Sequence, residues 1–303
     1  MLLEQVLTRL RSMVRGDVRS SEPMSRHTSF RVGGPADLYV RPADLPSLVA
    51  ALDILAGAGL PVLVVGLGTN LLVRDGGIRG AVVSTALLGG WHLEGDRLVA
   101  RCGSALSGLA RATARAGWSG LEFAAGIPGT LGGAVAMNAG AHGACLADVL
   151  ERVTVLGDSG PLTLGRDEAG FAYRDSRVRR EKLVVAEAVL RLRPTSPAQA
   201  EERIRQVLRA RAESQPRGVP SAGSFFRNPP GMAAGALIEQ AGCKGMRVGG
   251  AEVSPVHANF LVNRGGASAR DVLTLAARVR DRVAERFGIW LEPEVEVVGE
   301  DPS

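Results

Sequence analysis

The chain is poor in the residues that build metal and disulfide sites. Its three cysteines, Cys102, Cys145 and Cys243, lie far apart and form no CxxC pair. The four histidines do not cluster with them. Zinc sites and disulfide frameworks depend on closely spaced or evenly numbered cysteines. We therefore expect no metal site and no disulfide framework.

Long apolar runs and aromatic side chains are also scarce. No apolar run reaches the ~18 residues of a membrane span, and the N-terminus lacks the apolar core and cleavage site of a signal peptide. We expect a cytoplasmic protein with no membrane partner. The net charge of +5 and the pI of about 9.7 fit nucleic acid or phosphorylated small molecules equally. An aromatic content of only 4% argues against nucleic acid, because single-strand binding relies on base stacking.

The composition is that of a soluble globular protein with more than one domain. The 303 residues are 46% hydrophobic and 22% charged. At ~100–200 residues per domain, this length predicts two or three domains. The sequence Pro-Thr-Ser-Pro at 194–197 marks a boundary, after which a helix is expected to begin.

Capping residues predict where several helices begin and end. Asp44 precedes a segment with apolar residues at helical spacing and is its expected N-cap. Ser268 and Asp271 form a capping box for a long helix that Gly288 closes. Ser104 is expected to cap a further helix.

Alternating and β-branched segments predict strands. Residues 61–65 predict a buried strand, and 81–103 alternate like paired strands around a Gly-Gly turn at 89–90. Residues 289–298 predict a C-terminal strand with three glutamates on one side, because side chains alternate with a period of two. These glutamates are Glu292, Glu294 and Glu296.

The stretch 120–143, GLEFAAGIPGTLGGAVAMNAGAHG, is the strongest candidate for a binding site. It combines seven glycines with small apolar residues, and no charged residue follows Glu122. Glycines let the backbone approach a flat or phosphorylated ligand, because no Cβ keeps the main chain at a distance. A buried turn packed against a helix explains the same composition equally well.

A second glycine-rich loop, GLGTN at 66–70, lies between two predicted strands. It lacks the third glycine and following helix of the dinucleotide fingerprint, since Leu71 and an apolar run come next, and it lacks the lysine of a P-loop. Consecutive N–H groups in such a loop can bind a diphosphate without a helix dipole. A plain hairpin turn is the alternative.

Taken together and in order, seven motifs resemble the UDP-N-acetylenolpyruvoylglucosamine reductase (MurB) family. They are TSFRVGGPAD (28–37), VVGLGTNLLVRDGG (64–77), GLEFAAGIPGTLGGAVAMNAGAHG (120–143), YRDS (173–176), AGSFFRNP (222–229), AGCKGMRVGGAEVSPVHANFLVN (241–263) and LEPEV (291–295). The resemblance implies an α+β fold. An FAD-binding domain of the vanillyl-alcohol oxidase type, in subdomains at 1–80 and 81–194, would precede an α+β substrate-binding domain at 195–303.

The resemblance also implies a reaction in peptidoglycan synthesis. NADPH, the co-substrate, reduces a non-covalently bound FAD, and the enolpyruvyl ether of UDP-N-acetylglucosamine then enters the same cleft. Hydride passes from flavin N5 to C3 of the enolpyruvyl group, and a proton to C2 completes UDP-N-acetylmuramate. The oligomeric state stays open.

Roles follow from the resemblance residue by residue. Arg174 matches the arginine that stabilises the enolate, Ser224 matches the proton donor, and Glu294 matches an acidic partner. Residue type and context alone would make these three a surface charge, a turn residue and an exposed strand residue. Positions matched to substrate or NADPH are Tyr173, Arg227, Lys244 and Asn259. Positions matched to FAD are Arg31, Gly66, Leu67, Gly68, Thr69, Asn70, Leu71, Gly126, Ile127, Pro128, Gly129, Gly132, Gly133 and Asn138.

The chain has only two tyrosines, Tyr39 and Tyr173. Neither suits the mobile loop that closes over the nucleotide in the larger subtype of the family, so the chain resembles the shorter subtype. Other groups, such as arginines, must then hold the UDP moiety. The alternative function is an FAD-dependent oxidase of the same superfamily that acts on an alcohol or hydroxy acid. A non-catalytic nucleic-acid binder is favoured only by the pI.

Overall fold

The chain folds into two compact units, each assembled from separate stretches of sequence. A computed structural model describes residues 3–157 and 160–302. The first unit comprises Met1–Val18, Val40–Gly66 and Val83–Arg211, and the second comprises Arg19–Tyr39, Leu67–Val82 and Ala212–Ser303. The domains expected at 1–80, 81–194 and 195–303 divide the chain differently and stay a prediction.

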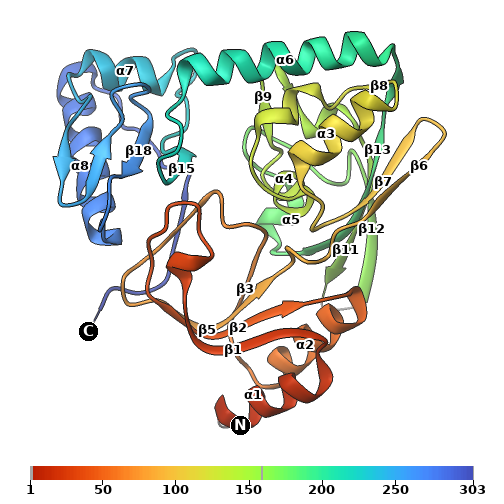
Figure 1. The fold of residues 1–303 in the computed structure, drawn as a ribbon. Helices are drawn as coiled ribbons and strands as arrows, with labels where there is room; N and C mark the ends of the chain where they lie inside the picture. The colour runs from red at the N-terminus through yellow and green to blue at the C-terminus, as the bar shows by residue number, and fades with distance from the viewer. Residues whose placement is uncertain (1–2, 158–159, 303) are drawn as a thin grey trace. The chain divides into compact units, whose positions relative to one another are not determined.

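An antiparallel sheet of five strands forms the centre of the first unit, in the order β12-β11-β13-β7-β6 (Figure 1). β13 lies in the middle of the sheet and is almost wholly buried, in keeping with its β-branched and small apolar residues. The strands are β6 (Trp91–Glu94), β7 (Arg97–Arg101), β11 (Leu150–Gly157), β12 (Gly160–Gly165) and β13 (Val184–Arg191).

Helices and short strand pairs complete the first unit. The helices are α1 (Leu3–Met13), α2 (Leu45–Gly57), α3 (Leu106–Arg115), α4 (Leu131–Ala136), α5 (Arg177–Arg180), α6 (Pro197–Ser214, to Arg211 in this unit) and the 3-10 turns η2 (Glu122–Gly126) and η3 (Leu146–Asp148). The pairs are β8 (Trp118–Ser119) with β14 (Arg193–Pro194) and β9 (Gly140–Ala141) with β10 (Ala144–Cys145). The predicted N-cap of α2 is confirmed, because Asp44 accepts a 2.9 Å hydrogen bond from the amide of Ser47.

Loop 66–70 joins strands of two different sheets. β3 (Val62–Val65), before the loop, belongs to a four-stranded sheet in the order β1-β2-β5-β3. β4 (Leu71–Val73), after the loop, pairs in parallel with β19 (Glu296–Val298). The hairpin alternative is therefore wrong, since the two flanking strands do not pair with each other. The other strands of this four-stranded sheet are β1 (Gly16–Pro23), β2 (Pro35–Pro42) and β5 (Ile78–Ser84). The 3-10 turn η1 (Met24–Arg26) follows β1.

The second unit has its own sheet, in the order β15-β18-β17-β16, and one buried apolar cluster. The long helix α8 packs against β16 and β17 (Figure 1). Its predicted capping box is confirmed, because Ser268 and Asp271 exchange hydrogen bonds of 3.0 Å, and Gly288 closes it at φ 68°. The elements are β15 (Ser221–Ser224), α7 (Ala234–Gln240), β16 (Arg247–Val248), β17 (Ala251–Val253), β18 (Phe260–Asn263) and α8 (Ala269–Phe287).

Two predictions between residues 81 and 105 are wrong. The hairpin turns at Gly95 instead of 89–90, because β6 and β7 pair with Glu94 opposite Arg97 and Gly95 adopts the left-handed conformation of a tight turn. Ser104 does not cap α3, whose N-cap is Ala105. The Ser104 hydroxyl instead donates a 3.0 Å hydrogen bond to the carbonyl of Gly90.

The predicted C-terminal strand is also mostly wrong. Only Glu296–Val298 forms a strand, and the preceding residues make isolated main-chain contacts. The three glutamates consequently differ in exposure: Glu292 and Glu296 are exposed, whereas Glu294 is partly buried. None of the described helices is long and apolar enough to cross a bilayer.

Candidate functional site

The two glycine-rich stretches meet in the first unit at Gly66 and Thr130. A Cβ at position 66 would overlap the Thr130 side chain, so this approach requires glycine. Thr130 is 2% exposed, and its hydroxyl has no hydrogen-bond partner among the described residues. A buried hydroxyl without a partner is unfavourable. The junction therefore fits a polar ligand group such as the diphosphate of a dinucleotide cofactor.

The glycines of the 126–133 segment differ in what surrounds them. A Cβ at Gly133, which is exposed in the first turn of α4, would meet the Thr130 hydroxyl only at 3.8 Å. Gly126 is instead covered by the side chain of Arg211, and burial lowers the pKa of that guanidinium. Gly129 has φ 133°, a backbone conformation that other residues rarely adopt. Of these positions, Gly133 best fits close approach by a flat ligand.

Two buried side chains tie the YRDS motif to the second glycine-rich stretch. Ser176 donates a 2.8 Å hydrogen bond from its hydroxyl to the carbonyl of Ala136, at the end of α4. Asn138 donates from its carboxamide to the carbonyl of Ala172, at 3.0 Å, and accepts from the amide of Ala147, at 3.0 Å. Asn138 thus links the main chain at Ala172 to the main chain at Ala147. Its approach to the flavin stays a prediction.

Arg174 is held between these anchors in an unusual backbone conformation. Its φ is 55°, in the left-handed region that few non-glycine residues occupy. Its guanidinium donates a 3.1 Å hydrogen bond to the carbonyl of Gly140 and lies 5.2 Å from the ring centre of Tyr173, which is 53% exposed. Backbone strain of this kind collects at functional sites. The structure thus places Arg174 beside the second glycine-rich stretch.

The second unit brings the GSFF and LEPEV motifs side by side. The main-chain amide of Glu294 donates to the carbonyl of Phe225 at 2.8 Å, and the amide of Arg227 donates to the carbonyl of Glu292 at 2.8 Å. Ser224 and Glu294 are both partly exposed, whereas Phe225 is buried. The predicted proton donor and its acidic partner therefore lie on adjacent segments.

Two asparagines brace these segments through their main chains. Asn259 accepts from the amide of Phe226 at 2.9 Å and donates to the carbonyl of the same residue at 2.8 Å. Its carboxamide thus makes both of its hydrogen bonds to the main chain of Phe226. Asn70, from loop 66–70, donates to the carbonyl of Glu294 at 3.1 Å. Both contacts are structural, and binding of substrate by Asn259 stays a prediction.

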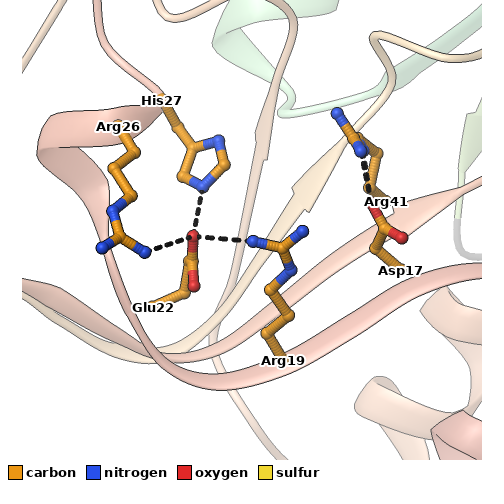
Figure 2. Close-up of polar contacts among 6 residues, drawn as sticks. All are labelled: Asp17, Arg19, Glu22, Arg26, His27 and Arg41. Atoms are coloured by element: carbon orange, nitrogen blue, oxygen red, sulfur yellow. Dashed lines mark hydrogen bonds and ion pairs between the residues drawn. The ribbon is translucent and has the colours of Figure 1, made fainter.

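An ion cluster in the second unit joins Arg19, Arg26 and His27 to Glu22 (Figure 2). A Cβ at Gly68 would overlap the carbonyl oxygen of His27, so residue 27 lies directly against the loop. The His27 ring contacts Glu22 at 2.9 Å, and this carboxylate also accepts from Arg19 at 3.1 Å and lies 3.9 Å from Arg26. Burial alone would raise the pKa of Glu22, but these partners outweigh it and lower the pKa.

The remaining predicted residues of the second unit are dispersed. Arg31 is exposed and has φ 55°. Lys244 forms a 2.7 Å ion pair with Glu239. Arg227 carries a buried Nε that has no hydrogen-bond partner among the described residues. Of these three residues, Arg227 lies nearest to the paired GSFF and LEPEV segments, because its amide bonds to the carbonyl of Glu292.

Sequence reasoning missed Thr130 and Ser176. Both lie inside recognised motifs, Thr130 between Gly129 and Leu131 and Ser176 at the end of YRDS. The available signal was a hydroxyl residue directly before a short helix, since Thr130 precedes α4 and Ser176 precedes α5. No group of three or more His, Cys, Asp or Glu residues that could hold a metal ion occurs in the described part of the chain.

Comparisons with known proteins converge on one family. The family model for an FAD binding domain matches residues 36–163, and the model for the C-terminal domain of UDP-N-acetylenolpyruvoylglucosamine reductase matches 215–298. The reductase of that name from Geobacter metallireducens is 50% identical over 299 residues, which cover 98% of this chain and 99% of the relative. The reductase from Heliobacterium modesticaldum is 49% identical over 297 residues, which cover 97% of this chain and 95% of that relative. The crystal structure of the Thermus caldophilus enzyme (MurB) superposes with a TM-score of 0.79 at 37% identity, over 94% of this chain and 99% of that one.

Proposed function

The chain belongs to the UDP-N-acetylenolpyruvoylglucosamine reductase family, and we propose that it reduces the enolpyruvyl ether of UDP-N-acetylglucosamine to UDP-N-acetylmuramate with NADPH. It is an FAD-dependent oxidoreductase of peptidoglycan precursor synthesis. An FAD-binding domain of the vanillyl-alcohol oxidase type is combined with the reductase C-terminal domain, as expected. The observation that carries the substrate assignment is the hydrogen-bonded pairing of the GSFF and LEPEV motifs.

We place FAD on the glycine-rich stretches of the first unit. When bound, FAD supplies the hydride that adds to C3 of the enolpyruvyl group. Gly66 and Gly133 let the backbone approach the cofactor, because neither position carries a Cβ. The unpartnered hydroxyl of Thr130 supports this placement.

We assign Arg174 to the carboxylate of the enolpyruvyl group. A guanidinium can hold a carboxylate with two parallel hydrogen bonds, and its charge stabilises the enolate that forms during reduction. Its left-handed backbone and its hydrogen bond to Gly140 support a fixed direction for the side chain. Ser176 and Asn138 anchor the surrounding segment through their hydrogen bonds to the carbonyls of Ala136 and Ala172.

We assign the proton at C2 to the Ser224 hydroxyl and its replacement to Glu294. A serine that gives up a proton must recover one, and Glu294 on the adjacent segment is the acidic candidate. Phe225 and Phe226 are 1% and 2% exposed, so they exclude water from one side of Ser224. Arg227 and Lys244 are assigned to the phosphates of substrate or NADPH, for which Lys244 must exchange its ion pair with Glu239.

We also propose that the protein belongs to the shorter subtype of the family. Tyr39 is 2% exposed, and its ring centre lies 4.0 Å from that of the His27 ring on which it stacks. Tyr39 is therefore a buried core residue. Tyr173 contacts Arg174 within YRDS. Neither tyrosine suits a mobile lid. Because NADPH and UDP-sugars are metabolites of the cytoplasm, we place the reaction there.

The test is the absorption spectrum of the purified protein under anaerobic conditions. A flavin spectrum should be bleached by NADPH and restored by the enolpyruvyl substrate, with formation of the lactyl ether. A colourless protein would contradict FAD binding. A flavin that NADPH leaves oxidised, but that an alcohol or hydroxy acid reduces, would instead identify an oxidase of the same superfamily.

A further inference from the structure

We infer that the hydroxyl of Thr130 donates a hydrogen bond to a phosphate oxygen of the FAD pyrophosphate. This inference rests on the proposed placement of FAD in the first unit. It follows from three observations: the burial of Thr130, the lack of a hydrogen-bond partner for its hydroxyl among the described residues, and its position opposite Gly66.

Thr130 differs from the other buried threonines of the described chain. Thr28, Thr85 and Thr113 each donate from the hydroxyl to a main-chain carbonyl, at 3.0, 3.2 and 2.9 Å. Thr130 is as deeply buried, at 2% exposed, yet its hydroxyl has no such acceptor among the described residues. Buried polar groups in folded proteins are normally paired. A bound ligand would supply the hydrogen-bond acceptor that the described residues do not provide.

Local helix capping does not use this hydroxyl either. Thr130 is the N-cap residue of α4, with an extended backbone at φ −105° and ψ 161°, but its side chain makes no capping hydrogen bond. Serine, threonine and aspartate at this position usually accept a bond from an amide in the first turn. Ser176, Asp44 and Ser268 do so in this protein. The Thr130 hydroxyl therefore makes no capping bond to its own helix.

The hydroxyl instead faces glycines that belong to both cofactor stretches. Its oxygen lies 2.3 Å from where a Cβ of Gly66 would be and 3.8 Å from where a Cβ of Gly133 would be. Gly66 begins the loop assigned to the pyrophosphate. A phosphate oxygen is a charged acceptor, and hydrogen bonds to charged groups are about twice as strong as neutral ones. An acceptor of this kind suits a lone buried donor better than a neutral carbonyl of the flavin ring.

The test compares Thr130→Val with Thr130→Ser and with Thr113→Val. We expect Thr130→Val to bind FAD about 10- to 100-fold more weakly, because a bond to a charged group is lost. Thr130→Ser keeps the donor and should stay within about threefold of wild type. Thr113→Val, which removes a buried hydroxyl that already has a carbonyl partner, should leave FAD affinity unchanged. Affinity is measured by fluorescence titration of the full-length deflavinated protein and by the rate of FAD release from the holoenzyme.

Two further measurements locate the acceptor and separate binding from folding. The thermal midpoint of FAD-free Thr130→Val should equal or exceed that of wild type, because the removed hydroxyl has no partner there. ADP, which carries the pyrophosphate without the flavin, should lose affinity in parallel with FAD, and the absorption maxima of bound FAD should not move.

Equal FAD affinity in Thr130→Val and wild type would overturn the inference and leave the proposed function intact. Weaker FAD binding with unchanged ADP affinity and shifted flavin absorption would also overturn it, because the hydroxyl would then face the ring. A wild-type protein that binds no FAD would overturn the proposed function and this inference together.

Discussion

The main-chain amide of Glu294 donates a 2.8 Å hydrogen bond to the carbonyl oxygen of Phe225. This single bond joins segments that are far apart in the sequence and sets Glu294 beside the residue that follows Ser224. Asn70 also holds Glu294 in place, because its carboxamide donates to the carbonyl of Glu294 at 3.1 Å. The separation between the proposed proton donor and its partner is thus controlled by main-chain contacts.

Replacing Ser224 should affect one half-reaction only. Ser224→Ala should slow reoxidation of the reduced enzyme by substrate ~10²–10⁴-fold, the usual contribution of a positioned acid. Reduction by NADPH should be unchanged, and Ser224→Cys should retain more activity because it keeps a transferable proton. Rapid mixing of reduced enzyme with substrate measures both steps. Glu292→Gln is the control on an exposed carboxylate, and wild-type reoxidation in Ser224→Ala would contradict the assignment.

Arg174→Lys should show whether the planar fork of the guanidinium is needed. Lysine keeps the charge but cannot make two parallel bonds to a carboxylate. We expect steady-state turnover to fall by ~10- to 100-fold, with reduction by NADPH close to wild type. Stopped-flow measurement of each half-reaction distinguishes the steps. Loss of NADPH reduction instead would assign Arg174 to nicotinamide binding.

Gly133→Ala tests cofactor approach against a matched helix position. Gly133 and Gly108 are both exposed residues in the first turn of a helix, in α4 and α3, with only ordinary contacts for a Cβ at 3.8 and 3.6 Å. Alanine should stabilise the FAD-free protein by up to ~0.5–1 kcal/mol at either site, because glycine is unfavourable in helices. Only Gly133→Ala should weaken FAD binding, as measured by titration. Equal FAD affinity in the two variants would remove Gly133 from the cofactor site.

The Glu22 cluster in Figure 2 should make stability depend on acid pH. Its folded-state pKa lies below the unfolded value of 4.5, so the carboxylate stabilises the fold above that pH and the contribution is lost as pH falls. Thermal midpoints between neutral pH and about pH 4 should therefore fall less in Glu22→Gln than in wild type. Glu202→Gln is the control, because its partner Arg205 is 63% exposed and solvent screens the pair. Identical pH profiles for Glu22→Gln and wild type would show that the cluster contributes nothing.

Local chemistry and motif identity were determined by the sequence alone. Asp44, Ser268 and Gly288 mark helix ends because their capping bonds reach only a few residues along the chain. The spaced motifs likewise predict the family, its FAD-binding fold and its reaction class. Such features depend on neighbours in the sequence.

Tertiary structure decided which distant groups each side chain meets. Ser104 has a side chain suited to helix capping, but its hydroxyl bonds to the carbonyl of Gly90. The carboxamide of Asn259 bonds to the main chain of Phe226. Loop 66–70 has the sequence of a hairpin turn but joins two sheets, because β4 finds its partner near the C-terminus. The hydroxyl of Thr130 is buried and finds no acceptor among the described residues. Burial and hydrogen-bond partners come from segments that only the folded chain brings together, so no local pattern specifies them.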